Sequence, residues 1–504
     1  MSPWRLAGDR LAALGDRIAL EGQGARVSYA ELAGRAASVW RALGKAGVLP
    51  GGLVALVSSG RAHDEAVGLT GILTLGAVAV PLDATAPPHR LASILAARGC
   101  RAIVLDEKAR LLADAVEAEL GRLLPHPSAP DAPLARVILD AAGVVVGASG
   151  KIAPEAMDPS RGALSGSLAC VLHTSGSTGL PKPVPITWAG LDAFTGWAID
   201  QFAITPADRV LRVAELIFDL AWFDHLATFR AGATLLTMSR RELAAGAAFR
   251  DALRALAPSV VYGVPSLFMK LSAVLPEGAP LLPAPRAVLY AGEVFPPREL
   301  RAFAERVPDA SIWNLYGPTE TNVCTFHPIE RAALDGERET PIGSACPYAR
   351  CSLLGEDGAR IEGPGTGELI VEGPTTLGGG PFATRDRVER GTDGLFYFRG
   401  RIDRMIKIRG YRVDPGEIEA VLGAHPDVRQ AAVVVHDDAR IGKTLRVFME
   451  IRPDAPPMTE RDFRIFLAER LPSYMVPERV TALSELPRTP TGKIDYRALA
   501  DRPS

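Results

Sequence analysis

The feature that most constrains this chain is a strand-like apolar run that opens into a loop of small residues. Leu168–Leu172 is apolar, and after His173 every residue from Thr174 to Gly179 is a glycine or carries a hydroxyl group. Such a loop has little side-chain bulk and many accessible backbone N–H groups, and a lysine follows it, so it suits a polyphosphate. The residues that we expect to bind the phosphates are Thr174, Ser175, Gly176, Ser177, Thr178, Gly179 and Lys182.

The loop alone does not decide its role, because Gly/Ser-rich stretches also serve as flexible linkers. No Gly-Lys-Ser/Thr closes it, so it is not the Walker pattern. The strand-like run before it and the lysine after it favour nucleotide binding over a linker.

The composition narrows the class of protein. Lys and Arg number 56 and Asp and Glu 58, a net charge of −2, which favours neither nucleic acid nor an anionic membrane as a partner. The five cysteines lack CxxC spacing, so we expect neither a disulfide framework nor a zinc site, and a cytoplasmic location. The first residues lack the apolar core of a signal peptide. Glycines and a proline interrupt the most apolar window, Ala66–Leu82, so we expect no membrane-spanning segment.

Alternating strand and helix patterns predict an α/β fold. Strand-type runs at Leu53–Val57, Ala77–Val80 and Ala102–Leu105 are separated by helical stretches, which is typical of a parallel sheet. The segment Leu123–Gly166 is rich in Pro, Ala and Gly, and we expect it to be an irregular connection. The alternation then resumes from Leu168 to about Phe326.

The last third of the chain has a different sequence pattern. Gly-rich turns between short strands follow Gly363 and indicate a distorted β subdomain, and a compact α+β unit follows Arg401. At 504 residues the chain is too long for one ordinary core. We therefore predict a large N-terminal α/β domain over residues 1–402 and a small α+β domain over residues 403–504.

Four further segments contain chemically useful groups, although each has an ordinary structural explanation on its own. Asp219 lies in the otherwise apolar Phe218–Phe223, where it either caps a helix, forms a salt bridge or binds a substrate ammonium. The turn Asn314–Thr321 can present an aromatic face to a base and an oxygen ligand to Mg²⁺. Asp386 can accept hydrogen bonds from a ribose, and Lys493 lies in a turn near the end of the sequence.

In their order and spacing, these segments resemble the ANL superfamily of adenylate-forming enzymes, and most closely the amino-acid adenylation domains of nonribosomal peptide synthesis. The similarity extends from about Ser28 to Leu499, nearly the whole chain. The motifs that jointly carry it are Ser175-Gly176-Ser177-Thr178-Gly179-Leu180-Pro181-Lys182, Tyr316-Gly317-Pro318-Thr319-Glu320, Gly400-Arg401-Ile402-Asp403, Lys407-Ile408-Arg409-Gly410 and Thr491-Gly492-Lys493-Ile494-Asp495.

The resemblance implies an ATP site with Mg²⁺. The loop Thr174–Lys182 would close over the β- and γ-phosphates of ATP. The adenine would contact Asn314 and Tyr316, with Gly292 lining its pocket. The ribose would be bound by Asp386 and Arg401. This chain departs from the family pattern at three places. Relatives usually have Thr-Gly-Asp where this chain has Thr384-Arg385-Asp386, which puts the local turn in doubt. They commonly have a glycine where Pro183 stands, and often a histidine where Trp188 stands.

The resemblance also implies the catalytic groups and a hinge. Thr319 would meet the α-phosphate, and Glu320 would bind Mg²⁺. Lys493 would bridge the substrate carboxylate and the α-phosphate. Asp403 corresponds to the hinge about which a mobile C-terminal domain turns between adenylate formation and transfer to a thiol.

The same alignment assigns a substrate pocket. Asp219 matches the aspartate with which relatives hold an α-amino group, so an α-amino or imino acid is favoured over a fatty or aryl acid. The remaining pocket residues are Phe218, Leu220, Phe223, Tyr262, Leu289, Ala291, Leu315, Val323 and Cys324. No second charge occurs among them, and the bulky members predict a small, flat cavity. The set resembles free-standing L-proline-activating domains of antibiotic biosynthesis, with pipecolate or another small apolar amino acid as open alternatives.

Only a short segment follows Lys493, so we expect the thiol acceptor to be the phosphopantetheine arm of a separate carrier protein. An acyl-CoA synthetase of the same superfamily is the nearest alternative, and Asp219 argues against it. A second alternative is a catalytically silent nucleotide-binding protein. The presence of both Glu320 and Lys493 argues against it.

Overall fold

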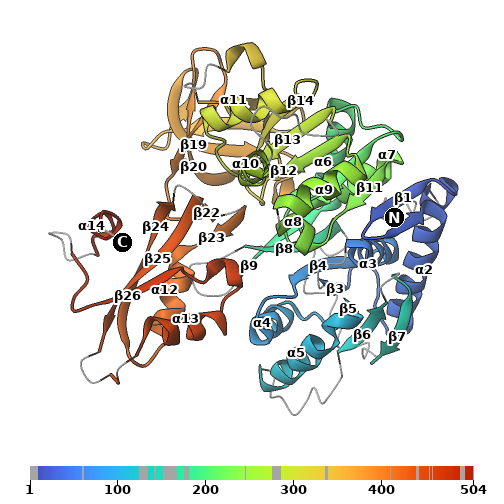
Figure 1. The fold of residues 1–504 in the computed structure, drawn as a ribbon, viewed down its shortest axis with the longest axis horizontal. Coiled ribbons are helices and arrows are strands. Elements are labelled where there is room, and N and C mark those ends of the chain that lie inside the picture. The colour runs from blue at the N-terminus through green and yellow to red at the C-terminus, as the bar shows by residue number, and fades with distance from the viewer. Residues whose placement is uncertain are drawn as a thin grey trace. The chain divides into compact units, whose positions relative to one another are not determined.

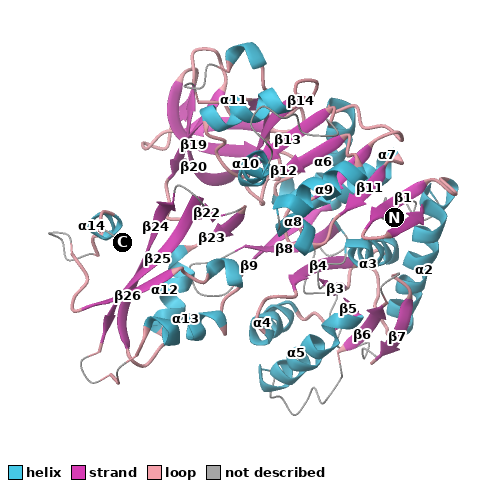
Figure 2. Cartoon of the chain, in the orientation of Figure 1, coloured by secondary structure: helices cyan, strands magenta, loops and turns pink. Residues whose placement is uncertain are grey.

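The computed structural model describes residues 10–58, 62–123, 134–140, 143–150, 167–174, 181–244, 246–274, 285–334, 339–408, 410–438, 442–452, 455–456, 458–488 and 494–502. Its helices and strands alternate along the first two thirds of the chain, which is the predicted α/β organisation (Figures 1 and 2).

A seven-stranded sheet contains the strands from β3 to β9. The order is β7-β6-β5-β3-β4-β8-β9, and β3 pairs in parallel with both β4 and β5. The bounds are β3 (Leu53–Ser58), β4 (Val78–Asp83), β5 (Ala102–Asp106), β6 (Ala135–Leu139), β7 (Val145–Ser149), β8 (Leu168–Thr174) and β9 (Lys182–Thr187).

The expectation of an irregular connection over Leu123–Gly166 is wrong for part of that segment. β6 lies within it and pairs in parallel with β5, and β7 pairs antiparallel with β6. Alternate residues of β6 are buried, so the strand is stabilised by covering an existing sheet rather than by a strong local signal.

A nine-stranded sheet forms the second layer, in the order β16-β15-β14-β13-β12-β10-β11-β1-β2. Its middle strands, from β10 to β14, are parallel. The bounds are β1 (Ile18–Gly22), β2 (Ala25–Ser28), β10 (Arg209–Arg212), β11 (Thr234–Thr237), β12 (Val260–Gly263), β13 (Ala287–Ala291), β14 (Ser311–Tyr316), β15 (Thr325–Pro328) and β16 (Ser344–Ala345).

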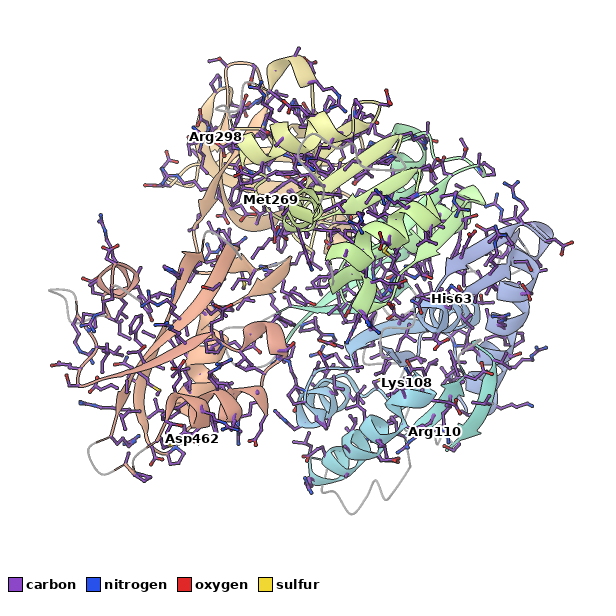
Figure 3. All side chains as sticks on the ribbon, in the orientation of Figure 1. His63, Lys108, Arg110, Met269, Arg298 and Asp462 are labelled. Atoms are coloured by element: carbon purple, nitrogen blue, oxygen red, sulfur yellow. The ribbon has the colours of Figure 1, made fainter. Side chains whose placement is uncertain are left out.

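Helices cover these sheets. They are α2 (Tyr29–Lys45), α3 (Ala62–Leu75), α4 (Pro88–Arg98), α5 (Arg110–Leu123), α6 (Trp188–Gln201), α7 (Leu220–Ala231), α8 (Arg240–Ala244), α9 (Gly246–Leu256), α10 (Pro265–Val274) and α11 (Pro297–Arg306). The capping box predicted at Ser28 is confirmed, since its side chain accepts from the Glu31 N–H and its own N–H donates to the Glu31 carboxylate. Charged side chains such as Lys108 and Arg110 lie exposed at the start of α5 (Figure 3).

The glycines of the apolar window Ala66–Leu82 have a packing role. A methyl group added at Gly71 of α3 would lie 2.6 Å from the Val39 Cβ of α2. The glycine therefore allows the two helices to approach closely, as a buried pair rather than a membrane span. Among the described residues, no helix is long and apolar enough to cross a membrane.

A five-stranded antiparallel sheet follows, in the order β18-β17-β19-β20-β21. The bounds are β17 (Arg350–Leu354), β18 (Arg360–Ile361), β19 (Gly365–Glu372), β20 (Phe382–Arg390) and β21 (Phe396–Arg401). Register shifts within the β19–β20 and β20–β21 pairs bend this sheet, which matches the expected distorted β subdomain.

The last elements form an α+β unit around a buried cluster that includes Ile418, Val447 and Phe463. They are β22 (Ile406–Ile408), β23 (Tyr411–Val413), α12 (Pro415–Gly423), β24 (Val428–Asp438), β25 (Gly442–Ile451), α13 (Glu460–Ala468), β26 (Arg479–Leu483) and α14 (Tyr496–Ala500). Asp414 caps α12 as expected, because its carboxylate accepts from the Gly416 N–H at 2.8 Å.

The chain divides into two compact units. The first contains Met1–Ala84, Leu95–Leu172 and Val184–Ile402, and the second contains Asp403–Ser504 together with Thr85–Ile94 and His173–Pro183. The predicted division at Asp403 did not include Thr85–Ile94 and His173–Pro183 in the second unit. The hinge role of Asp403 stays a prediction.

Candidate functional site

The carboxyl ends of three parallel strands, β12, β13 and β14, lie side by side in the first unit (Figure 1). Side chains on a strand alternate between faces. Tyr262, Leu289, Ala291 and Leu315 therefore share one face and pack in one buried cluster, whereas Val261, Val288 and Ile312 pack in another. The register places Tyr262 beside Leu289 and Ala291 beside Leu315. Four predicted pocket residues are thus brought together by the pleat of the sheet.

Helix α7 contributes further predicted pocket residues to the same cluster. Leu220 and Phe223 lie on its first turn and pack there, and the Phe223 and Tyr262 rings meet edge to face with centroids 5.3 Å apart. Val323 joins the cluster from the segment before β15. Cys324 packs in the adjoining cluster beneath the five-stranded sheet, and Phe218 is half-buried in the loop before α7.

Asp219 is the N-cap residue of α7, where its side chain accepts from the Leu220 N–H at 3.1 Å. The helix-cap explanation raised by the sequence is therefore confirmed. The Asp219 side chain is half-buried. Asp219 directly precedes Leu220, which packs on the apolar cluster, and its charge adds to burial in raising the pKa of the Tyr262 hydroxyl well above its usual value. The one charged member of the predicted pocket therefore lies next to its apolar wall.

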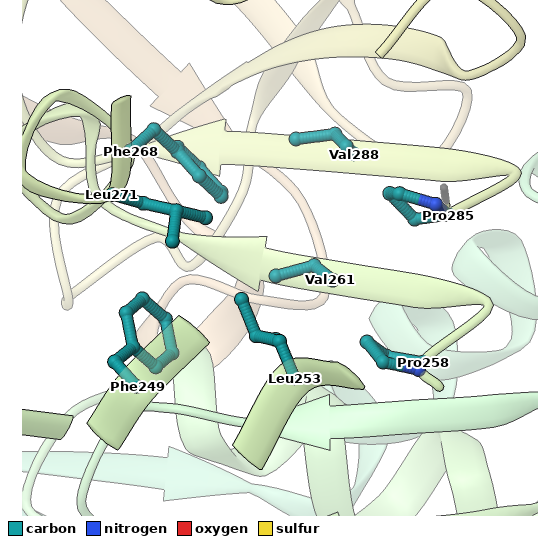
Figure 4. Close-up of a pocket in the computed structure, with 8 residues that line it drawn as sticks. All are labelled: Phe249, Leu253, Pro258, Val261, Phe268, Leu271, Pro285 and Val288. Carbon is teal, nitrogen blue, oxygen red and sulfur yellow. The ribbon is translucent and has the colours of Figure 1, made fainter. Parts of the chain in front are cut away.

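A small hollow lies on the opposite face of the same strands (Figure 4). It is enclosed by side chains of α9, α10, β12 and β13 and by two prolines, and all are apolar. The lining residues are Phe249, Leu253, Pro258, Val261, Phe268, Leu271, Pro285 and Val288. A charged or polar ligand would be left without partners there, so this hollow is not the candidate site.

The predicted ribose-binding residues form a hydrogen-bonded group. Asp386 on β20 is buried, and its two carboxylate oxygens accept from the Tyr316 hydroxyl and the Arg401 guanidinium. Burial, and next the Asp386 charge, raise the pKa of the Tyr316 hydroxyl well above its usual value. The hydroxyl therefore stays protonated and keeps donating, which orients the carboxylate.

The turn after β14 depends on Gly317. A Cβ at this position would lie 1.6 Å from the carbonyl oxygen of Asn322, so only glycine allows the chain to turn back on itself so tightly. The Thr321 N–H donates to the Pro318 carbonyl at 2.9 Å and closes the turn. Thr319 and Glu320 lie at its half-buried tip.

Most of the remaining residues predicted to bind the nucleotide lie on strands or at strand ends. Gly292 follows the end of β13 with a φ of +88°, a backbone conformation that favours glycine. The Asn314 side chain donates to the Pro341 carbonyl at 2.8 Å. Thr174 ends β8 and is buried, and Lys182 begins β9 and is exposed. Ser175, Gly176, Ser177, Thr178, Gly179 and Lys493 lie outside the described residues.

The backbone at Thr384-Arg385-Asp386 takes an unusual conformation. Arg385 has a φ of +61°, in the left-handed region where glycine is usual. The arginine thus adopts a conformation that favours glycine, and its N–H donates to the Glu368 carboxylate at 2.9 Å.

The protein's sequence matches the AMP-binding enzyme family over residues 9–379 and the AMP-binding enzyme C-terminal domain over residues 417–493. The chain belongs to the AMP-binding enzyme family. Members of this family use ATP, which fits the site at the carboxyl ends of the strands.

Two curated relatives of this AMP-binding enzyme carry the name L-proline--[L-prolyl-carrier protein] ligase. The relative from Pseudomonas fluorescens is 35% identical over 444 residues, which cover 85% of this chain and 84% of the relative. The relative from Streptomyces coelicolor is 37% identical over 354 residues, 66% of each chain. Among solved structures, the amide bond synthetase McbA from Marinactinospora thermotolerans matches with a TM-score of 0.80 and 24% identity, covering 98% of this chain and 99% of that one. This structural similarity supports the fold alone.

In this AMP-binding enzyme, the turn after β14 offers one protein ligand to a metal ion. Among the described residues, no three His, Cys, Asp or Glu side chains gather to hold a metal ion by themselves. A Mg²⁺ ion binds through one or two carboxylates together with phosphates and water. The half-buried Glu320 carboxylate suits that single role.

Sequence reasoning missed two ion pairs beside the loop that carries Asp219. Arg212 pairs with Glu65 and Arg240 pairs with Glu215. Their partners are distant in the sequence and no motif marks them, so no local signal would have found them.

Proposed function

We propose that this protein activates L-proline with ATP and transfers the prolyl group to the phosphopantetheine thiol of a separate carrier protein. The observation that carries the proposal is the carboxylate of Asp219, which directly precedes Leu220 of an apolar cluster that includes Phe223 and Tyr262. A secondary ammonium needs one anion, and its ring needs a small apolar surface. The names of the two curated relatives agree with this assignment.

The reaction would take place in two steps. An oxygen of the substrate carboxylate attacks the α-phosphorus of ATP, the bond from that phosphorus to the bridging oxygen breaks, and pyrophosphate leaves. The carrier thiol then attacks the acyl carbon, the bond to the AMP oxygen breaks, and the thiol proton passes to solvent. AMP and the thioester are the products.

We assign the protein groups as the motifs imply. Asp386 and Arg401 hold the ribose, Tyr316 and Asn314 contact the adenine beside Gly292, and Thr319 meets the α-phosphate. Mg²⁺ held by Glu320 would neutralise phosphate charge when bound. The Lys493 ammonium stabilises the negative charge on the α-phosphate during adenylation.

Pyrophosphate exchange tests the substrate. The protein should catalyse ATP–pyrophosphate exchange with L-proline more efficiently than with pipecolate or the other nineteen standard amino acids, and it should load a phosphopantetheine carrier in preference to coenzyme A. Faster exchange with a fatty or aryl acid, or no exchange at all, would contradict the proposal.

A variant at Lys493 tests the mechanism. Lys493→Ala should abolish exchange while leaving transfer from preformed prolyl-adenylate largely intact, because the ammonium acts on the first step only. Equal loss of both half-reactions would contradict its assigned role.

A further inference from the structure

The loop between β10 and α7, residues 213–219, ends in Asp219 and is held by hydrogen bonds of its own. The Phe218 N–H donates to the Glu215 carbonyl at 2.9 Å. The buried indole of Trp222 donates to the Leu216 carbonyl at 3.1 Å. These bonds make the loop a short, stiff connection, so a shift at Glu215 is transmitted to Asp219.

The Glu215 side chain is paired with Arg240, the first residue of α8. The Arg240 Nε lies 2.7 Å from one Glu215 carboxylate oxygen, and its Nη2 donates to the other at 3.0 Å. The same Nη2 also lies 3.4 Å from the carboxylate of Asp83, at the end of β4. The Nη2 contact is a charge-assisted hydrogen bond, whereas the Nε lies within ion-pair distance without forming a hydrogen bond. Arg240 therefore links the loop to the seven-stranded sheet.

A second ion pair fixes the start of the loop. Arg212, the last residue of β10, pairs with Glu65 on α3, and their side chains are only 4% and 7% exposed. Glu65, Glu215 and Arg240 line one small hollow together, so the two pairs adjoin. With Arg212 and Glu215 both anchored, the position of Asp219 follows from the few residues between.

We propose that Arg240 is a positioning residue for the amino-acid substrate, because its ion pair with Glu215 sets where the Asp219 carboxylate meets the substrate amine. This inference rests on the proposed function. Arg240 does not itself touch the substrate. The Arg240 and Glu215 side chains are 35% and 24% exposed, and neither belongs to a hydrophobic core cluster, so the loss of the pair should affect the substrate more than the fold.

The charge balance supports the same role. Burial raises the pKa of Glu215 above its ordinary value, and the adjacent Arg240 acts against that rise. Arg240 lies between the carboxylates of Glu215 and Asp83. If it is removed, the two negative charges repel each other, and the loop would relax away from the sheet.

The test compares Arg240→Met with Arg241→Met in pyrophosphate exchange. Arg241 is exposed on the same helix, so it is a matched control. Arg240→Met should raise the KM for L-proline about tenfold and leave the KM for ATP within twofold, because misplacement by a fraction of an ångström weakens the amine contact. Arg241→Met should change neither.

Cyclopentanecarboxylate, which keeps the ring and lacks the nitrogen, separates positioning from general disturbance. Arg240→Met should lower the preference for L-proline over this analogue about tenfold, and Arg240→Lys should restore part of it. Glu215→Gln should act in the same direction, and the double variant should be no worse than the more severe single one, because both changes break one contact.

Two results would overturn the inference. One is a proline KM in Arg240→Met within twofold of the wild type. The other is an equal rise in KM for L-proline, the analogue and ATP, accompanied by a lower melting temperature. Wild-type protein without proline-dependent exchange would instead overturn the proposed function, and the inference with it.

Discussion

Replacing Gly317 by alanine is the most demanding test of the turn that carries Thr319 and Glu320. The added Cβ would lie 1.6 Å from the Asn322 carbonyl oxygen, 2.6 Å from the carbonyl carbon and 3.1 Å from the Cys324 nitrogen. A carbon and a carbonyl oxygen approach to about 3.3 Å, so the two backbone segments would have to separate by about 1.7 Å. All three atoms belong to the main chain, so no side-chain rotation relieves the overlap.

The expected magnitude follows from that displacement. A misplacement of about 1 Å costs about 100-fold in rate, which corresponds to about 2.7 kcal/mol of transition-state stabilisation. Overpacking of this kind also lowers the free energy of unfolding by about 3 kcal/mol. Gly317→Ala should therefore reduce kcat/KM in pyrophosphate exchange by about 100-fold or more and shift the urea unfolding midpoint downward.

The matched control is Gly44→Ala. Gly44 lies exposed in α2, and a Cβ there would meet nothing within 4 Å. The control should keep full activity and gain about 0.5–1 kcal/mol of stability from its higher helix propensity. Gly317→Ala that retains exchange within threefold of wild type, with an unchanged unfolding midpoint, would refute the steric argument.

Three further predictions concern single contacts. Arg385→Gly should raise the free energy of unfolding by about 0.5–1 kcal/mol in urea titrations, since the φ of +61° suits glycine better; a loss of stability would contradict this. Burial opposes ionisation of Asp208, yet its forked pair with Arg286, at 2.7 and 2.8 Å, and its other hydrogen bonds lower its pKa to about 2. Asp208→Asn should therefore unfold at lower urea at pH 6, and the difference from wild type should shrink as the pH falls below about 4 toward 2; a difference independent of pH would count against the assignment. Tyr316→Phe should raise the KM for ATP about tenfold, because a charged hydrogen bond to Asp386 is lost, and an equal rise in the KM for the amino acid would argue for a wider disturbance.

The elements that the sequence predicted well are those whose cause is local. The capping box at Ser28 and the cap at Asp414 need only a side-chain oxygen and N–H groups two or three residues away. The left-handed turn at Arg385 was in doubt because glycine is absent there, and its conformation is fixed by the strands on either side. The strands β6 and β7 were missed because they depend on the edge of a sheet formed by other segments.

The sequence by itself determined the family motifs and the alternation of strands and helices, because both depend on spacing along the chain, whereas the predicted pocket residues came from the family resemblance. Only the tertiary structure decided that Tyr262, Leu289 and Leu315 share one face, since that depends on the register of three parallel strands. The contacts of Arg240 are of the same kind: Glu215 is 25 residues away and Asp83 is 157. Pairs at such separations leave no periodic or local pattern, so they exist only once the sheets have packed.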